Sequence, residues 1–296
     1  MAFSRPRFWE LLTAGPRGPL PLLSRSVETR GDFVVETLVF DLGDGQKMRG
    51  FVARPAGPGP FPALLYMHSH GGKYEIGADE MLKGHDYIGP LGPVFAAAGY
   101  VTLMVEMPLF GERATITESA LTKALLWRGK ILMGQMLSEL SGALGYLAAR
   151  ADVDAARIGA FGISMGSTHG FMLAALDDRV RAVAHLCCFA DYGVMIDLGA
   201  HDRHGHYMTI PGLVAETSPG EIAGSIAPRA QLVCLGEADA LTPPAAVAKA
   251  RGEVEAAYDA AGCPEALEIF IEPGIGHHET PAMRQKVLRF FDKSLA

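Results

Sequence analysis

The pentapeptide Gly-Ile-Ser-Met-Gly at residues 162–166 constrains the fold more than any other part of this sequence. A short apolar run comes directly before it, and a segment with helical character follows it. A serine at such a strand-to-helix junction is typical of a sharp turn that strains the serine backbone. A side chain at either Gly162 or Gly166 would collide with the neighbouring strand or helix. The pattern therefore predicts that Ser164 is held out at the end of a sheet strand.

Apolar runs alternate with helix-like segments along most of the chain. Such an alternation predicts an α/β fold with a mostly parallel central sheet and helices on both faces. The sheet is expected to start antiparallel, because Gly43-Asp44-Gly45 favours a hairpin between the first two strands. Strands are expected at residues 33–40, 46–54, 62–68, 100–105, 158–161, 180–186, 231–235 and 267–271, and helices at 93–98, 130–149, 165–176, 244–261 and 281–295.

The chain has 296 residues, of which 49% are hydrophobic, and we expect a single domain over residues 31–296. An N-terminal arm at residues 1–30, rich in Pro, Gly and Arg, is expected before it, with one short helix near residues 8–12. Insertions at about residues 107–129 and 189–226 leave from the carboxyl ends of predicted strands, where open α/β sheets bind ligands. We interpret them as cap-like walls of a pocket; ordinary surface helices are the alternative.

Acidic and histidine residues follow later strands in the order that an activated serine requires. A serine nucleophile needs a base, and the base needs an orienting acid. Asp239, in the loop after one predicted strand, is the candidate acid, and Glu237 is its competitor. His277, in the loop after the last predicted strand, is the candidate base, with His278 second. Ser164, Asp239 and His277 thus form a candidate catalytic triad.

Backbone N–H groups are expected to stabilise the oxyanion that such a serine generates. The N–H of Met165, directly after Ser164 at the start of a helix, is one expected donor. The other is expected from the loop at residues 68–73, where glycine lets the backbone approach a substrate closely. Gly72 is the first choice for this donor and Gly71 the second.

Two groups of histidines raise the alternative of a metal site. His68 and His70 lie in the expected oxyanion loop, and we interpret them as bracing it. The segment at residues 201–207 contains three histidines and a tyrosine within a predicted irregular insertion, where surface or pocket-lining roles are favoured over fixed metal geometry. Neither a metal nor an organic cofactor is therefore expected.

Other polar and apolar residues near these loops have ordinary structural interpretations. Asp79 and Glu80 suit the N-terminus of a helix, although a contact with substrate is the alternative. Trp127, Met133 and Met136 are expected in a helix core rather than in an apolar pocket.

The chain resembles the α/β-hydrolase superfamily from about Glu36 to the C-terminus. Within it, the chain is similar to the dienelactone hydrolase, acetyl xylan esterase and prolyl-oligopeptidase-like branch, through the motifs at residues 67–72, 108–113, 153–158 and 227–230. The resemblance implies a carboxylic ester hydrolase that forms an acyl-enzyme.

The chain also departs from this branch. Dienelactone hydrolases use a cysteine nucleophile where this chain has Ser164, prolyl-oligopeptidase relatives carry an N-terminal propeller, and many relatives have Asp at the position of Glu106. Glu106 is therefore interpreted as a support for the pocket.

The charge and hydropathy of the chain limit which partners and which cellular location can be expected. The net charge of −7 and the lack of a basic stripe argue against nucleic acid. No apolar run is long enough for a bilayer span, and the four cysteines suit a reducing compartment, so a cytoplasmic protein without membrane contact is expected. The expected partner is a small-molecule ester, and a homo-oligomer is left open. Peptidase, amidase or C–C bond hydrolase activity on the same triad is the alternative, and a non-catalytic receptor is another.

Overall fold

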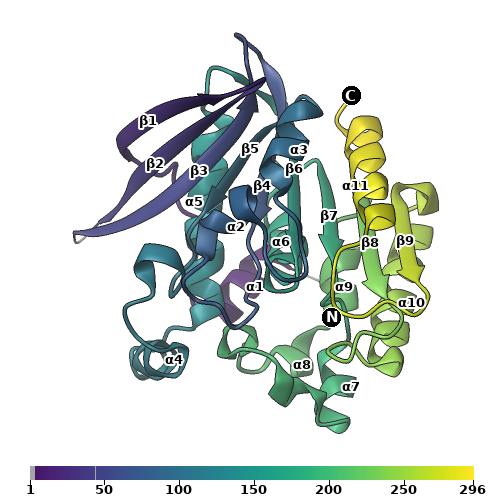
Figure 1. The fold of residues 1–296 in the computed structure, drawn as a ribbon. Helices are drawn as coiled ribbons and strands as arrows, with labels where there is room; N and C mark the ends of the chain where they lie inside the picture. The colour runs from purple at the N-terminus through teal and green to yellow at the C-terminus, as the bar shows by residue number, and fades with distance from the viewer. Residues whose placement is uncertain (1–3, 44) are drawn as a thin grey trace.

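The central sheet has the mostly parallel architecture expected from the sequence (Figure 1). The structure, a computed structural model, describes residues 4–43 and 45–296. Within them nine strands form one sheet in the order β1-β2-β3-β5-β4-β6-β7-β8-β9. The strands are β1 (Leu22–Arg30), β2 (Phe33–Gly43), β3 (Gln46–Pro55), β4 (Phe61–Met67), β5 (Val101–Val105), β6 (Val153–Ile163), β7 (Ala182–Leu186), β8 (Ala230–Gly236) and β9 (Leu267–Glu272).

The first three strands are antiparallel to their neighbours, whereas β5, β4 and β6 to β9 run parallel. The expected antiparallel start is therefore confirmed. Asp44, at the centre of the expected hairpin turn, lies outside the described residues. Parallel strands bring their carboxyl ends to one edge of the sheet, so the loops after β4, β6, β8 and β9 are gathered there.

Helices cover both faces of the sheet. α2, α3 and α11 contribute to the apolar core on one face, and α1, α5, α6, α9 and α10 to the core on the other. No helix in the described residues has the length and apolar character needed to cross a bilayer. The helices are α1 (Arg5–Leu11), α2 (Glu80–Lys83), α3 (Leu91–Ala97), α4 (Glu118–Trp127), α5 (Leu132–Ala148), α6 (Met165–Leu176), α7 (Tyr192–Asp197), α8 (Leu213–Glu216), α9 (Pro219–Gly224), α10 (Pro244–Ala260) and α11 (Pro281–Ser294).

Strand β4 shows why the parallel strands read as continuous apolar runs. Leu64 and Tyr66 belong to the core on the α3 side, while Ala63, Leu65 and Met67 belong to the core on the opposite side. Side chains alternate across a strand, and here both faces are covered by helices. All the expected strands and helices are present, with ends that differ by five residues or fewer.

Strand β1 corrects the expectation of an irregular arm up to residue 30. The arm does contain a short helix, α1, but Leu22–Arg30 forms the edge strand of the sheet. Every residue of β1 is exposed, so its sequence carries no apolar alternation. A strand without a buried face lacks the alternation of apolar and polar residues from which a strand can be predicted.

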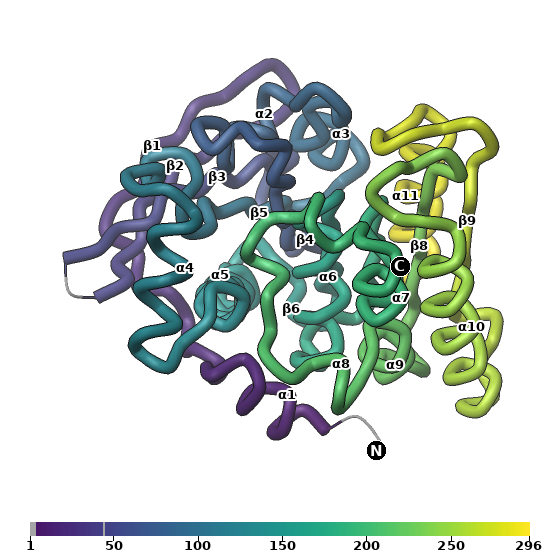
Figure 2. Tube along the Cα trace, turned by 90° about the horizontal axis from the view of Figure 1, so that it is seen from below, coloured from purple at the N-terminus to yellow at the C-terminus, as the bar shows by residue number. Residues whose placement is uncertain are grey.

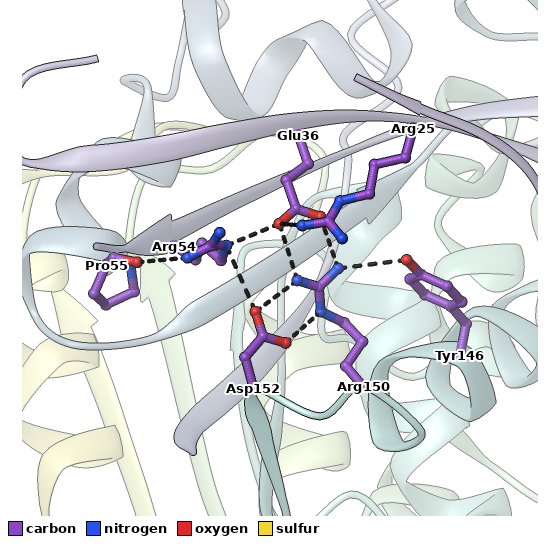
Figure 3. A network of polar contacts seen from close by, with 7 residues as sticks. All are labelled: Arg25, Glu36, Arg54, Pro55, Tyr146, Arg150 and Asp152. Atoms are coloured by element: carbon purple, nitrogen blue, oxygen red, sulfur yellow. Dashed lines mark hydrogen bonds and ion pairs between the residues drawn. The ribbon is translucent and has the colours of Figure 1, made fainter. Parts of the chain in front are cut away.

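A buried ion-pair network ties the antiparallel strands to the rest of the sheet (Figure 3). Glu36 of β2 is fully buried, and its carboxylate lies 2.7 to 2.9 Å from the guanidinium groups of Arg25, Arg54 and Arg150. Arg150 also pairs with Asp152 at 2.7 Å. Burial alone would raise the pKa of Glu36, but the three arginines hold it at about 2. The carboxylate is therefore charged in the folded protein.

The insertions at residues 107–129 and 189–226 leave from the carboxyl edge of the sheet, and the second returns along one face of the sheet through α9. In Figure 1 α4, from the first insertion, and α7 and α8, from the second, lie below the strands, and Figure 2 shows them from this end. Trp127, expected in a helix core, is 90% exposed. Helix α4 turns Glu118, Thr122 and Leu125 inward, and Trp127 falls two positions beyond Leu125 on the outer face.

Candidate active site

Ser164 lies at a tight junction between β6 and α6. Its backbone has φ of 57° and ψ of −119°, a conformation that is costly for a residue with a side chain. A Cβ atom on Gly162 would overlap the carbonyl group of Gly166, and one on Gly166 would overlap the carbonyl oxygen of Met67 in β4. Close backbone approach therefore requires glycine at both positions, for the reason expected from the sequence.

Asp239 and His277 form a hydrogen-bonded pair. Nδ1 of His277 lies 2.7 Å from Oδ2 of Asp239, and the N–H of Leu241 donates to Oδ1 at 2.9 Å. Burial alone would raise the pKa of Asp239, but these partners hold it below its ordinary value. With the carboxylate charged, Nδ1 carries the proton and Nε2 keeps a lone pair. Nε2 has no hydrogen-bond partner among the described residues, so it is available to accept a proton.

Cys187 connects the serine turn to this pair. The N–H of Ser164 donates to Leu186 O at 2.9 Å, and the Sγ of the next residue, Cys187, lies within 4.8 Å of ligand atoms of both Asp239 and His277. In the described part of the chain these three side chains are also the one cluster spaced for a metal ion. Burial raises the pKa of the Cys187 thiol, and the His277 proton already binds Asp239, so the donors favour a hydrogen-bonded pair over metal coordination.

The competing acid and base lie outside this pair. The carboxylate of Glu237 is exposed and accepts the N–H of Gly274 at 3.2 Å. His278 is exposed as well. The fold thus brings together Asp239 and His277, the first choices from the sequence.

Buried Glu80 holds the start of the loop after β4. Its carboxylate accepts the N–H of Ser69 at 3.0 Å, the O–H of Tyr66 at 3.1 Å and the O–H of Ser69. Burial nevertheless raises the pKa of Glu80 to about 7. His68 braces the same loop, because its Nδ1 lies 2.9 Å from Ser69 O and its Nε2 accepts the N–H of Met107 at 3.1 Å. The sequence suggested a helix terminus for Glu80, with a substrate contact as the alternative, and no motif indicated that its side chain turns inward beneath the loop.

The hydrogen bonds of the loop after β4 differ from the expectation for the oxyanion donors at one position, Gly72. The N–H of Gly72, the first choice, donates to Nδ1 of His70 at 3.1 Å and is thus engaged within its own loop. The N–H groups of Gly71 and His70 donate no hydrogen bond to a described residue. The same holds for Met165, whose N–H is one of the orphan groups at the start of α6. Because the imidazole of His70 binds the Gly72 N–H, the N–H groups of Gly71 and His70 are the better candidates for the oxyanion donor from this loop.

Glu118 joins this loop to both insertions. Its carboxylate accepts the N–H of Tyr207 at 3.0 Å and the O–H of Tyr74 at 3.2 Å, and it lies 3.5 Å from Nε2 of His70. Burial alone would raise the pKa of Glu118, but these partners hold it below its ordinary value. Since Nδ1 of His70 accepts the Gly72 N–H, the proton of His70 lies on Nε2, facing the carboxylate.

The second insertion is bonded to the loop that carries Asp239. Nη1 of Arg203 donates to Ala240 O at 3.1 Å, and Nε2 of His204 lies 2.9 Å from Leu241 O. The other nitrogen of His204 lies 3.9 Å from Sγ of Cys188. His204 therefore contacts the loop that carries Asp239 and the segment just after β7 rather than lying free on the surface.

Both insertions line hollows in the surface. A cavity of about 330 Å³ lies within the second insertion, with Tyr192, Met195, Leu213 and the histidines of the segment at residues 201–206 among its lining residues. A more open hollow of about 560 Å³ is lined by Tyr74, residues 114–119 and His206. The histidine-rich segment thus lines a cavity, one of the two roles favoured from the sequence.

Comparison with known proteins places the chain among hydrolases. No protein-family model matches it. Over 284 residues, 94% of each chain, it is 36% identical to YtaP of Bacillus subtilis strain 168, which is named as a hydrolase. Glucuronoyl esterase from Solibacter usitatus has a similar structure, with a TM-score of 0.71 and 17% identity over 99% of this chain and 92% of that one. Acetyl xylan esterase 1 from Thermoanaerobacterium sp. has a TM-score of 0.68 and 19% identity over 100% and 95%. At these identities the two structures establish likeness of fold alone.

Proposed function

The chain belongs to the α/β-hydrolase superfamily and has its fold, and from this premise we propose that it is a serine hydrolase of carboxylic esters. One observation carries the proposal. The 2.7 Å contact between Asp239 and His277 leaves the second nitrogen of the imidazole unpartnered, at the sheet edge where the strained turn holds Ser164. That arrangement supports a catalytic triad in which Asp239 is the acid, His277 the base and Ser164 the nucleophile.

The chemistry follows from these contacts. Nε2 of His277 takes the proton of Ser164 as Oγ attacks the ester carbonyl, and Asp239 stabilises the imidazolium that forms. The N–H of Met165, together with that of Gly71 or His70, donates to the oxyanion. The imidazolium then protonates the leaving alcohol. Water activated by the same imidazole releases the acid from the acyl-enzyme, which restores Ser164.

The names of proteins with a similar fold support an ester as the substrate. They include acetyl xylan esterases, a glucuronoyl esterase and a methylesterase, whose substrates differ in both the acid and the alcohol part. The ester bond is what these substrates share, so we assign the substrate of this chain as a small-molecule carboxylic ester.

Labelling with a fluorophosphonate probe tests the nucleophile. We expect the wild type to form a covalent adduct and Ser164→Ala to form none, because only an activated serine reacts rapidly with the probe. An unlabelled wild type would favour a non-catalytic receptor. Equal labelling of Ser164→Ala would place the nucleophile elsewhere.

A substrate panel tests the bond that is cleaved. Turnover of p-nitrophenyl esters and not of aminoacyl amides is expected, and turnover of amides alone would replace the esterase with a peptidase or amidase. For the base, His277→Ala should lose far more activity than the matched variant His278→Ala, whose side chain is exposed. The reverse order would exchange the two assignments.

A further inference from the structure

Tyr87 lies beside the proposed nucleophile, although no sequence motif points to it. Its hydroxyl oxygen is buried and has no hydrogen-bond partner of standard geometry among the described residues. The hydroxyls of Ser69 and Ser164 are nevertheless close enough to interact with it. On the other side, the ring of Tyr87 meets the ring of His277 edge-on, with centroids 5.4 Å apart. The phenol therefore lies between the oxyanion loop, the nucleophile and the base.

Gly71 leaves room for this approach. A Cβ atom at Gly71 would overlap Cε1 of His85 and would lie 2.8 Å from the Tyr87 hydroxyl oxygen, closer than real Cβ atoms come to other atoms. The absence of a side chain thus lets the His85 imidazole and the phenol both pack against the loop, in which the Gly71 N–H donates to no described residue. An unpartnered buried hydroxyl is costly unless an acceptor arrives, and at this place the arriving acceptor is a substrate oxygen.

The turn at residues 85–88, which carries Tyr87, is held by contacts within itself, with the oxyanion loop and with the loop that carries His277. His85 and Ile88 exchange backbone hydrogen bonds of 2.7 and 3.3 Å across a tight turn, and Asp86 pairs with Lys73 at 2.6 Å. The carbonyl oxygen of Tyr87 accepts the N–H of Glu279, two residues beyond the base, at 2.8 Å. These contacts fix the phenol relative to both the oxyanion loop and the base loop, as a preorganised donor requires.

We propose that Tyr87 is a further catalytic residue whose O–H donates a hydrogen bond to the oxyanion formed when Ser164 attacks the substrate carbonyl. This inference rests on the proposed ester hydrolysis. The phenol acts as a third donor beside the backbone N–H groups, and it neither gains nor loses a proton in the reaction. Burial raises the pKa of Tyr87 well above its ordinary value, and the nearby hydroxyls of Ser69 and Ser164 only partly oppose this rise. The phenol therefore stays protonated and remains a donor at neutral pH.

Tyr87→Phe is the decisive variant, because it removes the hydroxyl and keeps the ring that packs against His277. The loss of one oxyanion donor should lower kcat by about 10²-fold while KM changes by less than about threefold. The affinity for a trifluoromethyl ketone, whose adduct with serine carries an oxyanion, should fall in parallel with kcat. Tyr258→Phe is the matched control, because its hydroxyl donates to Arg229 O at 2.7 Å within the core that α10 forms.

Each outcome decides the proposal. A Tyr87→Phe enzyme whose kcat and ketone affinity both stay within about threefold of wild type would overturn it, as would a loss of kcat that leaves ketone affinity unchanged. An equal loss in Tyr258→Phe would show that any buried tyrosine hydroxyl has this effect, which would also overturn it. Failure of ester hydrolysis itself is distinguishable, because the wild type would then show no turnover that Ser164→Ala abolishes.

Discussion

Replacing Glu80 by glutamine should change the pH dependence of stability in a definite direction. Glu80 is fully buried beneath the oxyanion loop, and burial raises its pKa from 4.5 to about 7. A glutamine has nearly the same shape, keeps an oxygen that accepts the Ser69 N–H, and cannot ionise. The variant therefore removes the cost of charging a buried carboxyl group and leaves the contacts of the loop in place.

The sign follows from the raised pKa of Glu80. A folded-state pKa above the unfolded value makes a contribution to stability that is fully present below pH 4.5 and is lost as the pH rises through about 7. At about 1.4 kcal/mol per pH unit, the rise in pKa corresponds to about 3 kcal/mol. Relative to Glu80→Gln, the wild type should therefore lose about 3 kcal/mol of unfolding free energy between pH 4.5 and pH 8.

Urea denaturation of both proteins between pH 4.5 and pH 8 measures this difference. Fluorescence and circular dichroism should give coincident transitions, so that the free energies are comparable. Only the change of the difference with pH matters, since a constant offset reports the packing of the amide. A difference that stays flat over this range, or that moves in favour of the wild type as the pH rises, would refute the reasoning.

Three further experiments test other parts of the structure. Glu36→Gln should cost about 3 to 5 kcal/mol of unfolding free energy at neutral pH, because it leaves three arginines beside an uncharged group. In denaturation experiments the stability advantage of the wild type should disappear as the pH falls from 4.5 towards about 2. An advantage that does not change with pH would contradict the low pKa of Glu36. Gly166→Ala should prevent folding or lower the free energy of unfolding by several kcal/mol, because its Cβ atom would overlap β4. Gly252→Ala in α10 has open space around it and should raise the free energy of unfolding by about 0.5 to 1 kcal/mol, so similar melting temperatures for the two variants would refute this reasoning. Asp239→Asn should lower kcat on esters by about 10⁴-fold and Glu237→Gln by less than about threefold, and comparable losses in steady-state kinetics would mean that the acid is misassigned.

Strands and helices could be predicted from the sequence where they are strongly buried. Strands with both faces covered, such as β4, are continuous apolar runs, and the glycines around Ser164 report a steric requirement that is local in the chain. Asp239 and His277 could be chosen because each lies in the loop after a predicted strand. Strand β1 escaped detection because an exposed edge strand has no apolar face.

The remaining residues near the site depend on contacts between segments that are distant in sequence. Gly72 looked suitable as a donor, but the imidazole of His70 binds its N–H, which is visible only in three dimensions. Tyr87 belongs to no motif, and its turn reaches the site because Glu279 binds its backbone nearly two hundred residues further along the chain. Glu118 likewise meets Tyr207 only after both insertions have folded. Side chains that support a site are therefore harder to read from the sequence than those that define it.

The bonds from Arg203 and His204 to the carbonyl groups of Ala240 and Leu241 bear on how this enzyme can evolve or be engineered. The segment that lines the neighbouring cavity is not a detachable specificity module, because it shares its anchor points with the loop that positions Asp239. Changes that reshape the cavity should therefore also shift Asp239, the proposed acid, and alter turnover. Grafting this insertion onto a related scaffold should therefore require the loop at residues 237–242 as well, because the two segments are hydrogen-bonded to each other.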